Sequence, residues 1–377
     1  MTKLKIYFSL VFSFLFFINC SYSDNIQFSY RKVPDKLIIN ESISGLNRQG
    51  YKDITSYLPK NYSKRGNVDY TSYIQNALDK EKRIIMPNFP ILVNAGGLSV
   101  HSNTSIIFQT NSNIIIQPNN KTNYGIINII NKSNVNLYNV RVTGDKYKHL
   151  GNTGEWGMGL NIIGSKNIEI INPNVTQCWG DGIYIGTRGV LPENITISGG
   201  IVDDNRRNGI TIISGKDITI KNIVLSNTNG TLPMAGIDLE PNKANESLNN
   251  VNMIDITSYN NAKYGYAINL TKLLSNSTQN TTINLLKCTN YYSPNSVIIP
   301  GLNDNYIGSI KKIHGLIKIF DFKSYDSKRA IDMTVGHYNY TPNITVDNFQ
   351  IFNNDLRNEA KEREVLNWMR SKNFLVD

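Results

Sequence analysis

Two carboxylate residues, Asp238 and Glu240, stand two positions apart in the segment GIDLE, which begins at Gly236. Side chains at positions i and i+2 of a β-strand share one face, about 6.6 Å apart, so these carboxylates are expected to be neighbours. Neighbouring carboxylates split their pKa values, which lets one act as an acid and the other as a base. Such a pair can support hydrolysis, and it can also bind Ca²⁺, so a calcium cofactor stays open.

Two earlier segments of similar sequence carry further charged residues, namely Asp181 in one and the pair Arg206 and Arg207 in the other. A guanidinium can hold a uronate carboxylate by two hydrogen bonds and make the adjacent C–H acidic, a step that lyases and epimerases share. Structural alternatives are a turn cap for Asp181 and surface salt bridges for the arginines. The predicted catalytic residues are Asp181, Arg207, Asp238 and Glu240.

Aromatic and polar residues around these segments are candidates for substrate binding. Trp179 and Tyr184 can stack on sugar faces, although Trp179 is equally suited to the core. Residues 142–159 form an insertion between two repeats, and long loops on a regular scaffold commonly carry binding residues. Its histidine, His149, can act as an acid or base. The predicted substrate-binding residues are Trp179, Tyr184, Arg206, Asp204, His149 and Trp156.

A repeat organises the middle of the chain. Short apolar-alternating segments begin at Gly159, Gly182, Gly209, Gly236 and Tyr266, at intervals of 23 to 30 residues, and a second series (NIEIINP, NITISGG, DITIKNI) lies between them. Several short strands in each unit of this length indicate a solenoid with coils about 4.8 Å apart. The sequence predicts an all-β right-handed parallel β-helix in which the alternating isoleucines point inward.

The ends of such a stack need covering, because a terminal coil exposes unpaired backbone and apolar core. Residues 69–80 place apolar side chains on one helical face and are predicted to form an N-terminal capping helix. The predicted domains are a tether at 24–64, the parallel β-helix at 65–350 and a C-terminal helical tail at 351–377.

The segment VDYTSYIQNALDKEKRIIMPNFPILV, which begins at Val68, resembles the N-terminal cap of the pectate-lyase-like superfamily, which includes polygalacturonases, tailspike enzymes and uronan epimerases. Residues 178–242 are similar to a segment of many uncharacterised bacterial right-handed β-helix proteins. The resemblance spans roughly 65–350 and is specific for architecture. The polygalacturonase pattern is not reproduced, because Asp204 and its neighbour sit too far ahead of the next strand and no histidine follows before Asn242.

The first residues have the form of an export signal. Lys3 precedes an apolar run at 6–18 that is too short to span a membrane. Cys20 follows this run, as the lipidated cysteine does in a bacterial lipoprotein signal, whereas Ser-Tyr-Ser at 21–23 offers a cleavage site instead. The sequence therefore predicts an export signal at 1–23 and two alternatives: an envelope lipoprotein attached to a membrane through Cys20, or a periplasmic or secreted protein.

The charge balance indicates the kind of partner. The chain of 377 residues has a formal net charge of +10, which favours anionic partners. No run of basic residues interleaved with aromatic ones is present, so nucleic acid is not predicted. We expect an exported carbohydrate-active enzyme that cleaves or epimerises an acidic polysaccharide, with lyase, hydrolase and epimerase all open. The alternative is a non-catalytic glycan-binding or surface-structural β-helix.

Overall fold

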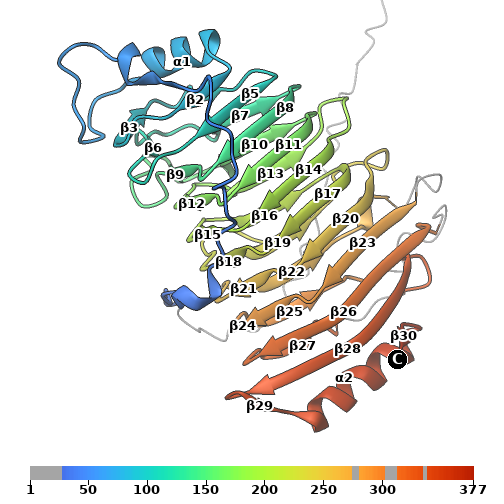
Figure 1. Cartoon of the computed structure of the whole chain (residues 1–377). Helices are drawn as coiled ribbons and strands as arrows, with labels where there is room; N and C mark the ends of the chain where they lie inside the picture. The colour runs from blue at the N-terminus through green and yellow to red at the C-terminus, as the bar shows by residue number, and fades with distance from the viewer. Residues whose placement is uncertain (1–27, 274–279, 302–311, 334–337) are drawn as a thin grey trace, which may run out of the picture.

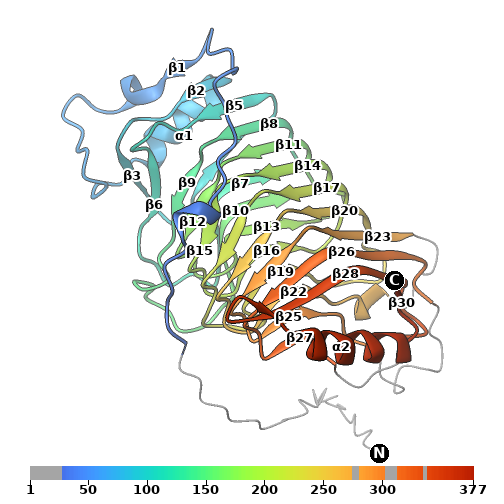
Figure 2. The same ribbon diagram turned by 60° about the horizontal axis from the view of Figure 1, so that its bottom comes forward.

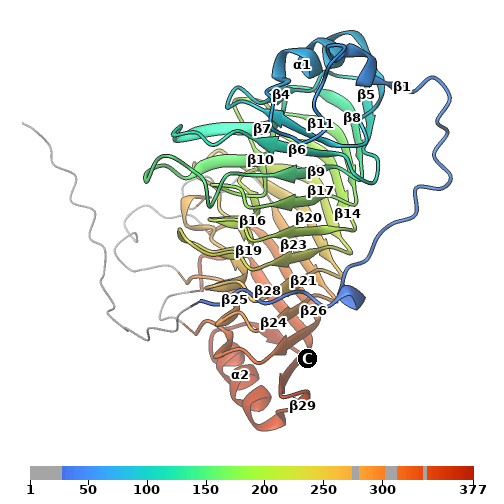
Figure 3. The same cartoon turned by 90° about the vertical axis from the view of Figure 1, so that its left-hand side faces the viewer.

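The computed structural model describes residues 28–273, 280–301, 312–333 and 338–377, and nearly all regular structure within them is β-strand. Strands stack coil upon coil into an elongated solenoid, with helix α1 (Thr71–Lys80) at one end and helix α2 (Glu359–Ser371) at the other (Figures 1 and 3). The predicted parallel β-solenoid is confirmed. The predicted export signal and Cys20 lie outside the described residues.

The predicted repeat segments form one parallel sheet, sheet B. Gly209 belongs to a row of glycines at the edge of this sheet, where an added Cβ would overlap the carbonyl oxygen of Gly236 on the next coil. Glycine at this repeat position therefore allows adjacent coils to approach closely. In stacking order, the strands are β4 (Leu98–Ser99), β7 (Asn123–Ile130), β10 (Trp156–Ile163), β13 (Ile183–Gly186), β16 (Asn208–Ile212), β19 (Ala235–Leu239), β22 (Tyr264–Ile268), β25 (Asn295–Ile298) and β27 (Arg329–Ile331).

The remaining coil strands belong to sheet A, which has two parallel ladders. The first ladder contains β2 (Arg83–Ile85), β5 (Thr104–Ile107), β8 (Ser133–Tyr138), β11 (Lys166–Ile171), β14 (Glu193–Ser198), β17 (Gly215–Lys221), β20 (Leu248–Ile254) and β23 (Thr281–Leu286). The second contains β3 (Pro90–Val93), β6 (Asn113–Ile116), β9 (Arg141–Thr143), β12 (Asn174–Thr176), β15 (Ile201–Asp203), β18 (Val224–Ser226), β21 (Thr257–Tyr259) and β24 (Thr289–Tyr291). Strands β26 (Gly315–Tyr325) and β28 (Asn343–Asn353) continue both ladders.

The interior follows the predicted alternation. Ile183 pairs in register with Ile210, which pairs with Ile237, and all three side chains are buried. Outward positions of the same strands carry Tyr184, Thr211 and Asp238, which also share one register. The isoleucine column forms the core, and the adjacent column points away from it, although Thr211 and Asp238 in that column are also buried.

Stacked asparagines form the turns between strands. Asn134, Asn167 and Asn194 occupy the left-handed region with φ between 54° and 59°, which asparagine tolerates better than most residues. Each donates its side-chain N–H to the residue one coil earlier, at 2.8 to 3.0 Å. This ladder accounts for part of the abundance of asparagine in the chain.

Both ends of the solenoid carry helices. In α1 the side chains of Ile74, Ala77 and Leu78 are buried in the main core, although a capping role for this helix stays a prediction. At the other end α2 lies beside β27 and β28 (Figure 2) and buries Val365 and Met369 in the same core. None of the helices in the described ranges is long and apolar enough to cross a bilayer.

The remaining strands and 3₁₀ turns are short. They are β1 (Lys52–Asp53), β29 (Leu356–Arg357), β30 (Leu375–Val376) and the 3₁₀ turns η1 (Asp35–Leu37), η2 (Ile54–Tyr57) and η3 (Thr271–Leu273). Strand β1 pairs with β2, and β28 continues to Asn353, so sheet A extends beyond both predicted boundaries, 65 and 350.

Residues 28–49, which we call the strap, run along the side of the solenoid, in dark blue in Figure 1. The strap passes the coils in reverse order: the carbonyl of Ser29 accepts from Asn260, Arg31 exchanges hydrogen bonds with Asn227, and Glu41 does so with Asn172. This segment falls within the predicted tether, and in the structure it is bound side-on to the coils.

Candidate active site

The predicted catalytic residues meet on sheet B around the guanidinium of Arg207. Asp181 lies two residues before β13, and Arg207 lies directly before β16. Asp238 lies within β19, and Glu240 directly follows that strand. Because the three strands pair in register, residues before and after them lie on one surface. The insertion adds a further carboxylate, Glu155. We call these five residues the Arg207 cluster.

Arg207 contacts carboxylates through all three of its nitrogens. Nη1 lies 3.3 Å from Asp181 Oδ2, Nη2 lies 3.2 Å from Glu240 Oε2, and Nε lies 3.5 Å from Glu155 Oε2. Burial opposes the charge on Arg207, but the surrounding carboxylates outweigh it and raise its pKa. The guanidinium therefore holds carboxylates from three different coils in one place.

Two carboxyl groups of the cluster are buried. Asp181 is 0% exposed, and its Oδ1 accepts a hydrogen bond from the backbone N–H of Asn208 at 3.1 Å. Asp238 is 1% exposed, and its Oδ2 accepts from Nδ2 of the same asparagine at 3.2 Å. Asn208 therefore connects the two buried groups.

Burial changes the protonation of both groups. It raises the pKa of Asp181, with the charge of Arg207 opposing this rise. Burial, followed by the charge of Glu240, raises the pKa of Asp238 well above its usual range. Asp238 therefore retains its proton to higher pH than a free carboxyl group does.

The exposed members of the cluster are the ones that a polymer can reach. The side chain of Glu155 is 47% exposed and that of Glu240 is 31% exposed, whereas the Arg207 side chain is 12% exposed. Tyr184 lies beside the cluster in the outward column, and burial, followed by the charge of Asp181, raises its pKa to about 12. The buried acids thus support a surface formed by two glutamates.

A second group of predicted residues forms a stack that is separate from these ion pairs. The rings of His149 and Trp179 are stacked, with centroids 4.0 Å apart. The guanidinium of Arg206 also lies over the Trp179 ring, with Cζ 3.8 Å from the ring centroid. Nδ1 of His149 lies 2.8 Å from Oδ2 of Asp145, which also accepts from Tyr124 through Oδ1. The His149 side chain is 0% exposed, and Trp179 is buried.

The remaining predicted binding residues lie at the borders of the insertion. Asp204 is buried and accepts hydrogen bonds from Lys146 at 2.7 Å and from Tyr147 at 2.8 Å. Trp156 begins β10 and is 51% exposed. Of the predicted binding residues, Trp156 is therefore the aromatic one that presents a free face. The roles in substrate binding assigned to Asp204, His149 and the others stay predictions.

Sequence reasoning placed Glu155 in the insertion that could border the groove but gave it no catalytic role, and it did not name Asn208. Asn208 precedes Gly209 as Asp181 precedes Gly182, so the repeat register carried a signal for it. Glu155 belongs to the insertion, which has no equivalent on other coils. Within the described residues, no group of three or more histidine, cysteine, aspartate or glutamate residues is arranged to hold a metal ion.

Comparison with known proteins gives weak likenesses. No family model matches the chain. The SPbeta prophage-derived uncharacterized protein YorA of Bacillus subtilis (strain 168) is 26% identical over 163 residues, which cover 38% of this chain and 28% of YorA. This chain therefore spans less than a third of that relative's length.

Solved structures resemble this chain in fold. The ORF18 protein of Geobacillus virus E2 has a TM-score of 0.53 at 12% identity, over 82% of this chain and 59% of that one. The tailspike gp49 of Acinetobacter baumannii bacteriophage Fri1, a capsular polysaccharide depolymerase, has a TM-score of 0.46 at 14% identity, over 82% and 58%. At these identities the likeness concerns the fold alone.

Proposed function

We propose that this protein is an exported carbohydrate-active enzyme that acts on an acidic polysaccharide at the Arg207 cluster, and that the reaction is hydrolysis of a glycosidic bond. The observation that carries the proposal is the pairing of a buried carboxyl group, Asp238, with a partly exposed one, Glu240, beside a second exposed carboxylate, Glu155. Glycoside hydrolysis requires one group that gives a proton and one that activates water or attacks the sugar.

The extent to which each carboxyl group of the Arg207 cluster is buried indicates its role in the proposed hydrolysis. Asp238 is the carboxyl group that burial and the neighbouring Glu240 keep protonated, and Glu240, which is partly exposed, is the member placed to relay that proton to a glycosidic oxygen. Glu155, the most exposed carboxyl group of the cluster, is the one placed to activate water or attack the sugar. Asp181 and Asp238 are positioning residues, because both are buried behind Arg207. Arg207 stabilises the negative charge that remains when the proton leaves the pair.

Hydrolysis fits the cluster better than elimination or epimerisation does. Those reactions need a cation that neutralises the substrate carboxylate, and Arg207 was predicted to do this. However, its nitrogens already contact Asp181, Glu155 and Glu240 within 3.5 Å. A uronate would have to displace at least one of these groups. The formal net charge of +10 still favours an anionic polymer over the surface as a whole.

A second candidate function is supported by the same contacts. A closed network of ion pairs with two buried carboxyl groups can hold adjacent coils together without turning over a substrate. In that case the protein is a non-catalytic glycan-binding or surface-structural β-helix.

Product analysis separates these functions. The full chain is incubated with a panel of uronans and capsular polysaccharides, and we measure reducing ends, the ultraviolet absorbance of unsaturated sugars, and the epimer ratio by NMR. Hydrolysis predicts new reducing ends without unsaturated products. Unsaturated products or a changed epimer ratio would contradict hydrolysis. Binding without any product would favour the non-catalytic alternative.

Export belongs to the proposal and rests on residues 1–23. If Cys20 is lipidated, Cys20→Ser should move the protein from the membrane fraction to the soluble fraction. Unchanged partitioning would indicate cleavage near Ser23 and a periplasmic or secreted protein.

A further inference from the structure

The strap encloses space against sheet A on a different side from the Arg207 cluster. At one point it is fixed by Asn172, whose Oδ1 accepts from Glu41 N at 2.7 Å and whose Nδ2 donates to Glu41 O at 2.9 Å. Further along, Nη1 of Arg83 donates to Gln49 O at 2.8 Å. No hydrogen bond joins residues 42–48 to the solenoid within the described ranges. The strap is therefore fixed on both sides of a gap.

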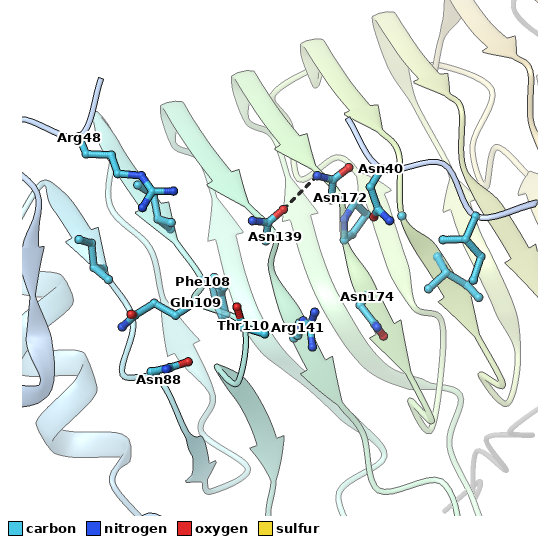
Figure 4. Close-up of a pocket in the computed structure, with 16 residues that line it drawn as sticks. Asn40, Arg48, Asn88, Phe108, Gln109, Thr110, Asn139, Arg141, Asn172 and Asn174 are labelled. Carbon is cyan, nitrogen blue, oxygen red and sulfur yellow. Dashed lines mark hydrogen bonds between the residues drawn. The ribbon is translucent and has the colours of Figure 1, made fainter. Parts of the chain in front are cut away.

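A cavity of about 530 Å³ lies at this gap, between the strap and the turns of β8 and β11 (Figure 4). An adjoining cavity of about 540 Å³ shares Asn88, Thr110, Arg141 and Asn174 with it. The lining is polar along most of its length, and Figure 4 shows Arg48 from the strap at one edge and Arg141 on β9 near the centre.

The charges of this lining are not compensated. Arg48 and Arg141 are exposed, and within the described residues neither forms an ion pair. Among the residues that the structure describes, no aspartate or glutamate lines either cavity. The nearest strap carboxylate, Glu41, already accepts from Nδ2 of Asn222 at 2.8 Å. The site therefore carries two cationic groups that form no ion pair with any described residue.

Neutral hydrogen-bonding groups surround these arginines. The side chains of Asn40, Asn174 and Thr110 make no hydrogen bond within the described residues, although all three line the first cavity. Amide and hydroxyl groups match the hydroxyls of a sugar, and a guanidinium matches a carboxylate or sulfate through two parallel hydrogen bonds. Both kinds of group occur side by side here.

We propose that the cavity under the strap is a binding site for an anionic oligosaccharide, separate from the Arg207 cluster. Hydroxyls of the sugar bind the free amides, and its carboxylate or sulfate groups bind Arg48 and Arg141. The site lies on the turns of sheet A, whereas the cluster lies on sheet B, so saccharide binding here does not depend on turnover at the cluster.

Calorimetry on the full chain tests this proposal, with Glu240→Gln as background so that little substrate is consumed during the titration. The probes are a hexamer of galacturonic acid, a sulfated hexasaccharide and a neutral glucose hexamer. We expect an anionic hexamer to bind, with affinity that falls as salt rises, and the neutral hexamer not to bind. Comparison of the uronate with the sulfated probe identifies the anion that the site prefers.

Arg141→Gln and Arg48→Gln should each weaken binding by about tenfold or more, because each removes charge-assisted hydrogen bonds. The matched control is Arg363→Gln on α2, which makes the same change in charge far from the cavity and should leave binding unchanged. Binding that is equal in the Arg48/Arg141 double variant and the parent, tighter binding of the neutral hexamer, or no binding of either anionic probe would overturn the proposal. Binding that depends on Arg141, together with no turnover of any polysaccharide by the wild-type protein, would contradict the hydrolase and leave this site standing.

Discussion

Arginines on two sides of this solenoid have opposite surroundings. On sheet B, Arg207 contacts three carboxylates within 3.5 Å and is largely buried among them. Beside the strap, Arg48 and Arg141 are exposed, with amides and hydroxyls around them and no acidic residue in the described part of the lining. A compensated charge fixes the positions of its neighbours, whereas an uncompensated charge remains available to a ligand. The first side is suited to hold reacting groups, and the second to recognise an anion.

The largest expected effect is a loss of stability when Arg207 is replaced. Arg207→Met should lower the free energy of unfolding by about 3–5 kcal/mol, because Asp181 and Asp238 would lose the cation that offsets their burial. Arg141→Gln should change it by less than about 0.5 kcal/mol, since this side chain is exposed and unpaired. Urea unfolding of both variants measures the difference. Equal values for the two would contradict the contrast between the sides.

The strap supplies the next prediction. Asn172→Ala should cost about 1–3 kcal/mol locally, because the side chain satisfies both the N–H and the carbonyl of Glu41. Hydrogen exchange of the Glu41 and Gly200 amides should accelerate, and anionic saccharide binding should weaken. Asn134→Ala is the control. Asn134 has a φ of 59°, close to the 52° of Asn172, but its side chain bonds to Asn103 and not to the strap. If both variants exchange alike, the strap is not fixed by Asn172.

The fold and the centre of the site could be predicted because the repeat defines equivalent positions. Gly182, Gly209 and Gly236 mark the same point on successive coils. Asp181 and Arg207 stand one and two residues before this point on adjacent coils, so the repeat places them beside each other. The contact of Arg207 with the residues after β19 follows from the same register.

Other parts of the site could not be predicted from periodicity. Glu155 lies in an insertion, so no register relates it to Arg207. Residues 28–49 have no repeat, and their position depends on pairs such as Arg31 with Asn227, which are far apart in the sequence. The burial of His149 likewise depends on how the insertion folds over Trp179.

A smaller effect is expected from pH. The pKa of Asp238 is raised in the folded chain, so its contribution to stability is fully present below the unfolded pKa and is lost as the pH rises through the folded pKa. The loss is at most about 1.4 kcal/mol for each pH unit within this window. Asp238→Asn, which stays neutral, should match the wild type in acid and become more stable at alkaline pH. Parallel stability curves for the two proteins would contradict a raised pKa.

The rate of reducing-end release by Glu240→Gln tests the central claim most directly, because the substitution keeps the size of the side chain and removes its proton transfer. Glu364→Gln on the exposed face of α2 makes the same chemical change as a control. With the polysaccharide that the wild type degrades best, Glu240→Gln should fall by about 10²-fold or more while Glu364→Gln retains the wild-type rate. An undiminished rate in correctly folded Glu240→Gln would contradict catalysis at the Arg207 cluster.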